Sequence, residues 1–146
     1  MRGPLVEELT PAPDPLETCA RFADGGLPHL VFLDGANYSF LCADPVAVVR
    51  VPDTPDPIDP IGAARALLAP HHAQPIPDLP PFQAGLAGFI GYDWGAERER
   101  VIRPANGGLP IPDVFLGLYD WVITWDHAVG RAWIVSTGIG DSGLGP

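Results

Sequence analysis

The sequence predicts an α+β fold, sandwich-like and mostly antiparallel in its sheet, with two or more short helices and many loops rich in proline. One observation is the order of the periodic segments along the chain, which alternates a helix, several short strands, a second helix and further strands. That many short strands favour antiparallel sheet over a parallel α/β fold. The other observation is the distribution of the 19 prolines, which cluster at 4–15, 52–60, 70–81 and 104–112, between the apolar segments. Proline in these places marks connections between elements rather than a disordered tail.

Two helices are expected from their start and stop signals. Asp14 is placed to cap the first helix, Pro15 fits its first position, and Glu17 completes a capping box. This helix is expected to end at Gly25, because glycine commonly terminates helices. A second helix is expected over 60–69, between an aspartate and a proline.

The strands are predicted from apolar or Val-rich runs between turn residues. The last two of these runs are expected to form a hairpin, with Gly130 where the turn requires a positive φ. The predicted strands are 30–34, 38–43, 46–51, 84–92, 114–125 and 131–137.

Composition bounds the possible partners and the compartment. The 146 residues carry a net charge of −10, and all eight basic residues are arginine. Phosphate backbones and anionic membranes would repel such a chain, so we expect neither nucleic acid nor membrane as a partner. Cys19 and Cys42 lie in apolar surroundings and are expected to be free thiols. No signal peptide or membrane span is visible, so we expect a cytoplasmic protein.

Two sequence patterns suggest chemistry, and both are weak. Ser142 lies in a Gly-Asp-Ser-Gly string four residues from the last position, where a nucleophile would lack structural support. The adjacent His71 and His72 diverge and suggest no third metal ligand. No pair of carboxylates has a context that suggests acid–base catalysis.

The apolar run 81–93 contains glycine at every third position, which matches neither a dinucleotide fingerprint nor a phosphate-binding loop. In a strand, Gly85, Ala87, Phe89 and Gly91 would share a face, which would be nearly bare at both ends. Another backbone, a helix or a ligand could then approach closely.

A turn between two predicted strands gathers polar groups. Asp34, Gly35, Tyr38 and Ser39 bring a carboxylate, hydroxyls and backbone N–H groups together. The arrangement suits a small polar ligand, and it equally suits a plain hairpin with an Asx-type turn.

Residues 81–93 resemble the glycine-tyrosine-aspartate segment in the N-terminal domain of chorismate-utilising synthases, the family of aminodeoxychorismate synthase component I and anthranilate synthase component I. Three further segments, 31–36, 38–45 and the late hairpin 112–134, resemble that family in the same order. The resemblance implies an N-terminal domain over 1–138, a tail or interdomain linker over 139–146, and a catalytic chorismate-binding domain that is absent from this chain.

The resemblance implies a function for the parent enzyme, the amination of chorismate to 4-amino-4-deoxychorismate for para-aminobenzoate and folate synthesis. The alternatives are the anthranilate branch of tryptophan synthesis and a stand-alone ligand-binding or regulatory module. We expect this chain, as a truncated product or fragment, to be inactive alone and to hold no catalytic residue and no cofactor. Magnesium is expected on the catalytic domain. The expected partners are that domain, a glutamine amidotransferase component II and tryptophan.

The resemblance also implies site residues. The positions that match the family's tryptophan pocket are Gly35, Tyr38, Ser39, Phe40 and Leu41, and the family often has Ser where this chain has Gly35. The positions that match its structural motif are Gly85, Gly88, Gly91, Tyr92 and Asp93. A domain that normally packs on a second domain should also expose apolar surface, so we expect self-association or marginal stability.

Overall fold

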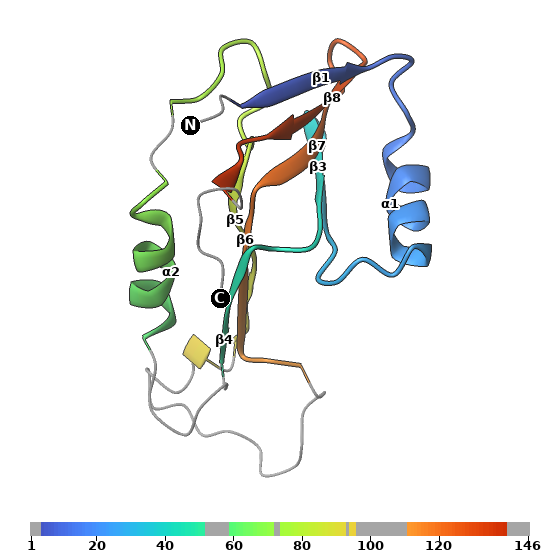
Figure 1. Cartoon of the computed structure of the whole chain (residues 1–146). Helices are drawn as coiled ribbons and strands as arrows, with labels where there is room; N and C mark the ends of the chain where they lie inside the picture. Colours follow the sequence, from blue (N-terminus) through green and yellow to red (C-terminus); the bar gives the residue numbers. More distant parts are fainter. Residues whose placement is uncertain (1–3, 52–58, 72–73, 93, 96–110, 140–146) are drawn as a thin grey trace.

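The computed structural model describes residues 4–51, 59–71, 74–92, 94–95 and 111–139, and within them it shows two helices and eight strands. The helices are α1 (Pro15–Asp24) and α2 (Pro60–Leu68), one on either side of the strands (Figure 1). Every strand pairing is antiparallel. The predicted α+β class with mostly antiparallel sheet is therefore confirmed.

The strands form two sheets. The larger has five strands in the spatial order β1 (Leu5–Leu9), β8 (Arg131–Ser136), β7 (Trp121–Asp126), β3 (Tyr38–Cys42) and β2 (Val31–Asp34). The smaller has three strands in the order β4 (Ala47–Val51), β6 (Val114–Tyr119) and β5 (Gly85–Ile90).

Both helices begin as their sequences predict. The side chain of Asp14 accepts a hydrogen bond of 2.8 Å from the backbone N–H of Glu17, and Pro15 occupies the first turn. Asp59 caps α2 in the same way through the N–H of Ile61. Such caps satisfy N–H groups that would otherwise lack partners at a helix start.

The core follows the alternation of side chains along the strands. In the larger sheet, Leu41, Ile123 and Trp125 point to the face that Cys19 and Phe22 of α1 cover. On the opposite face, a second buried cluster contains Val122, Trp133 and Val135. A third cluster joins the two sheets and consists of Cys42, Ala87 and Tyr119. Helix α2 packs against the smaller sheet and buries Ala64.

The segment 114–125 was predicted as one strand, and this was wrong in detail. The structure breaks it at Asp120, so that β6 lies in the smaller sheet and β7 in the larger. The carbonyl of Asp120 accepts a hydrogen bond of 2.8 Å from the N–H of Thr137, which fixes the corner. The chain changes sheets a second time between β3 and β4, where Asp44 has a positive φ of 53°. A run of apolar residues does not reveal such a corner, because each half satisfies the strand pattern.

Strand β1 was not predicted. It pairs along its whole length with β8, from Leu5 opposite Ser136 to Leu9 opposite Ala132. Four of its five residues are exposed, so no face of the strand is buried. Its sequence therefore lacks the alternation of apolar and polar residues that predicts a strand.

The glycine segment forms β5, and the close neighbour that its bare backbone admits is β6. Gly88 has φ 152°, and a side chain there would run into the carbonyl group of Phe115. The N–H of Gly91 donates to the carbonyl of Asp113 at 2.6 Å, which extends the contact beyond the strand. His72 and Ser142 lie outside the described residues, as do residues 93 and 96–110.

Neither described helix has the length and apolar character that crossing a membrane requires.

Candidate functional site

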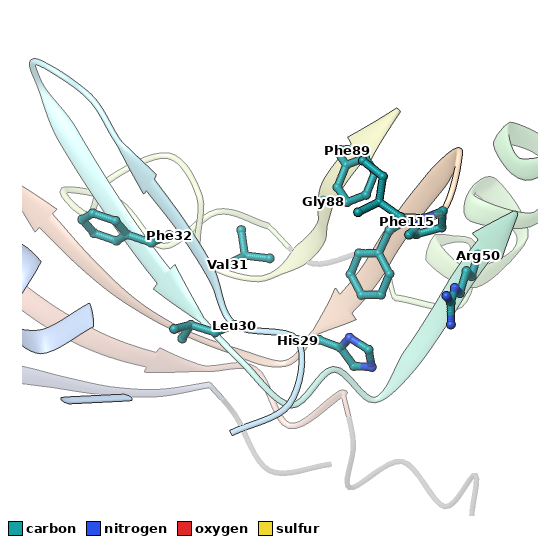
Figure 2. A pocket seen from close by; sticks show the side chains of 10 residues that line it. His29, Leu30, Val31, Phe32, Arg50, Gly88, Phe89 and Phe115 are labelled. Carbon is teal, nitrogen blue, oxygen red and sulfur yellow. The ribbon is translucent and has the colours of Figure 1, made fainter. Parts of the chain in front are cut away.

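A cavity on one face of the smaller sheet has a volume of about 500 Å³ (Figure 2). Its walls come from residues 29–32, at the start of β2, and from β4, β5 and β6. Ile111 and Pro112, just before β6, complete it. This volume lies within the range of 300–1,000 Å³ that is typical of small-molecule sites.

The strand register builds one wall of this cavity. Arg50 of β4 and Phe89 of β5 are both cross-strand partners of Phe115 of β6, so the three side chains form a row on one face. The rings of Phe89 and Phe115 are stacked with 6.2 Å between centroids and 26° between planes. Figure 2 shows this row beside His29, whose ring lies 4.8 Å from that of Phe115.

His29 is held in place by a constrained backbone. Its φ of 53° is uncommon for a residue with a side chain and costs about 1–3 kcal/mol. The Tyr119 hydroxyl donates a hydrogen bond of 2.7 Å to the His29 carbonyl. Burial raises the pKa of the Tyr119 hydroxyl above its ordinary value, which keeps this donor protonated. The hydrogen bond therefore fixes the backbone from which the His29 ring reaches Phe115.

Charge inside the cavity has one sign. The described residues that line it include no aspartate or glutamate, and among them Arg50 contributes a guanidinium. Of the four described arginines, Arg21 and Arg131 form ion pairs with Glu17 and Glu8, whereas Arg50 and Arg65 form none.

The turn predicted from sequence to hold a ligand is a second candidate site, and its polar groups bind one another. The Ser39 hydroxyl lies 2.6 Å from Oδ1 of Asp34 and 2.7 Å from Nε2 of His127, and Ser39 is fully buried. A hydroxyl has one proton, and an ionised carboxylate can only accept, so Ser39 donates to Asp34. The Nε2–H of His127 must then donate to the Ser39 oxygen.

This arrangement is a lock between two hairpins rather than a nucleophilic site. A serine nucleophile needs a histidine nitrogen that accepts its proton, whereas Nε2 of His127 carries its own proton here. The backbone N–H of His127 also donates to the carbonyl of Asn37 at 3.0 Å. The sequence does not predict the contact between Ser39 and His127. The contact depends on the pairing of β3 with β7, which brings the two turns together.

The remaining residues of the predicted tryptophan pocket lie along the same turn and strand. A Cβ on Gly35 would lie 2.9 Å from the carbonyl oxygen of Tyr38, so the turn would have to shift to accept a serine. Tyr38 and Phe40 are half-buried, and Phe40 packs edge-on against Phe82 at 5.7 Å. Leu41 is fully buried in the core. None of these residues lines the cavity of Figure 2, and the tryptophan pocket stays a prediction.

The residues of the predicted structural motif are separated by the fold. Gly85 and Gly88 lie in β5, and Gly91 follows it. Gly88 also lines the cavity. Tyr92 is 84% exposed, and Asp93 lies outside the described residues.

Among the described residues, no three His, Cys, Asp or Glu side chains converge in the way that metal ligands do.

The chain is similar to component 1 of the chorismate-utilising synthases, which confirms the predicted resemblance and is consistent with their N-terminal region. It is 47% identical over 58 residues to aminodeoxychorismate synthase component 1 of Salmonella typhimurium, which covers 40% of this chain and 13% of that protein. The Escherichia coli protein of the same name is 36% identical over 80 residues, covering 53% and 17%. Anthranilate synthase component 1 of Streptomyces coelicolor is 31% identical over 136 residues, covering 90% and 25%.

The matched region thus spans a quarter or less of the length of each of these relatives. No protein-family model matches the chain.

Proposed function

We propose that this chain is the non-catalytic N-terminal domain of an aminodeoxychorismate synthase component 1. In this role it supports a chorismate-binding domain that aminates chorismate to 4-amino-4-deoxychorismate with ammonia from a glutamine amidotransferase. The observation that supports the proposal is the identity of 36–47% to proteins of that name from three bacteria. Magnesium, in this proposal, is held by the chorismate-binding domain.

The polar residues of the described part are consistent with a supporting role. The buried Ser39 hydroxyl belongs to the lock between the hairpins, where it donates a hydrogen bond to Asp34 and accepts one from His127. The Cys42 thiol is also unsuited to nucleophilic chemistry, because burial raises its pKa to about 12 and keeps it protonated near neutral pH.

A reconstitution assay tests the proposal. The chorismate-binding domain of the Escherichia coli relative, made without its own N-terminal region, is mixed with the amidotransferase, glutamine, magnesium and chorismate, with or without this chain. We expect no product from this chain alone and an increase in 4-amino-4-deoxychorismate, measured by chromatography, when it joins the domain. Turnover by this chain alone, or no increase over an unrelated acidic protein, would contradict the proposal.

The anthranilate branch is the second candidate, and the length of one match favours it. The similarity to the Streptomyces coelicolor anthranilate synthase component 1 extends over 90% of this chain. The same assay with the chorismate-binding domain of that relative, read out by anthranilate fluorescence, distinguishes the branches. A larger increase with the anthranilate partner would favour this second function.

Tryptophan is proposed as a ligand of the turn that contains Gly35 and Tyr38, either within the enzyme or in a stand-alone regulatory module. Isothermal titration calorimetry with L-tryptophan tests this, with Tyr38→Ala as the variant. Heat of binding that the variant loses supports the proposal, whereas no heat with the wild-type chain rejects it.

A further inference from the structure

The cavity of Figure 2 is separate from the predicted tryptophan pocket, and its chemistry indicates a ligand of its own. We propose that it binds a small planar carboxylate, with the anionic group on Arg50 and the flat apolar body against Phe115 and Phe89. This proposal is independent of which synthase branch the chain serves.

The first argument is the shape and character of the wall. Phe89 and Phe115 present two rings whose planes differ by 26°, and the ring of His29 adds a third at 32° to Phe115. A flat ligand can stack on such a wall, as aromatic rings stack on one another. Phe89 is 43% exposed and Ile111 is 62% exposed, so a ligand would remove apolar surface from water.

The second argument is the charge. Phe115 is only 8% exposed and is the cross-strand partner of both Arg50 and Phe89, so a ligand that stacks on the exposed ring of Phe89 extends across Phe115 toward the guanidinium. Guanidinium groups bind carboxylates with two parallel hydrogen bonds. None of the described residues that line the cavity is acidic, so none of them competes for Arg50 or repels an anion.

The third argument is the construction of the site. His29 adopts a left-handed backbone conformation, and the Tyr119 hydroxyl holds its carbonyl from the buried cluster between the sheets. Residues kept in uncommon backbone conformations concentrate at functional sites. The aromatic wall is thus already in place without a ligand, which lowers the ordering cost of binding.

The test uses the whole chain and 2-naphthoate as the probe, with 2-naphthamide as its uncharged analogue. The variant is Arg50→Gln, which keeps hydrogen-bonding capacity and removes the charge. The matched control is Arg65→Gln, because Arg65 is an exposed arginine of α2 that does not line the cavity. Circular dichroism verifies that each variant is folded, and titrations followed by NMR give the affinity and the location.

We expect naphthoate to shift the amide signals of His29, Phe89 and Phe115, and to bind about tenfold more weakly to Arg50→Gln than to wild type. Arg65→Gln should bind naphthoate as tightly as wild type does. Naphthamide should bind wild type more weakly than naphthoate does, and its affinity should be the same for all three proteins. The proposal would be overturned by any of three results: no binding of naphthoate, an equal loss of naphthoate affinity in the two arginine variants, or NMR shifts centred on Gly35 and Tyr38. The reconstitution assay does not depend on this result, so the two proposals can fail separately.

Discussion

Replacing Gly88 with alanine tests the inference that β5 uses glycine so that β6 can approach closely. The Cβ of an alanine here would overlap the carbonyl oxygen of Phe115 and would lie 2.9 Å from its carbonyl carbon and 3.1 Å from the Cα of Leu116. All three atoms are backbone, so no side-chain rotation can relieve the overlap. The strand pair would have to separate.

The expected cost has two parts. A φ of 152° is strained for a residue with a side chain, at about 1–3 kcal/mol. Separating the strands also weakens at least one hydrogen bond of the ladder, at about 1 kcal/mol. We therefore expect a loss of roughly 3 kcal/mol, a large part of the 5–15 kcal/mol that is typical of small domains.

Gly26→Ala is the matched control, because Gly26 has a positive φ of 70° and nothing lies within 4 Å of its added Cβ. Gly26→Ala should lower the free energy of unfolding only by the cost of a side chain at positive φ, about 1 kcal/mol. Urea unfolding followed by fluorescence of the four tryptophans measures both variants against wild type. The reasoning is refuted if Gly88→Ala is no less stable than Gly26→Ala.

Three further changes test single hydrogen-bonding groups, each by urea unfolding. Ser39→Ala removes the hydrogen bonds of Ser39 with Asp34 and with His127 and should cost about 1–2 kcal/mol; unchanged stability would show that the lock is not formed in solution. Thr124→Val removes a buried hydroxyl without a hydrogen-bond partner and should be neutral or stabilising by up to about 1 kcal/mol, whereas Thr137→Val loses a bonded hydroxyl and should destabilise. Tyr119→Phe should cost about 1 kcal/mol at pH 8. The raised pKa of Tyr119 keeps this side chain neutral in the folded protein, whereas in the unfolded chain it ionises above about pH 10. The free energy of unfolding of wild type should therefore fall above pH 10, and the difference between wild type and Tyr119→Phe should narrow. A constant difference from pH 8 to 11 would contradict this.

The elements that the sequence predicted are those whose determinants are local. Helix α1 is an example, because Asp14 and Pro15 act within one turn of the helix that they start. The hairpin of β7 and β8 is another, since Gly130 supplies the positive φ of its turn. In both cases the residues that decide the structure are neighbours in the chain.

The features that the sequence did not predict depend on pairing between distant segments. The corner at Asp120 exists because β6 and β7 find partners in different sheets, although their sequences continue one another. The cavity gathers residues from four segments, and no local motif joins them.

The pairing of β1 with β8 has a consequence for how the protein is made. Leu5 leaves the ribosome early, but its partner Ser136 is synthesised only after almost all other described strands. At roughly 5–20 residues per second, the backbone of β1 waits on the order of ten seconds without its partner. Unpaired strand edges promote association between chains. The growing chain can therefore associate with other chains through β1 until β8 is made, and faster translation of the later segments should improve the yield of folded protein.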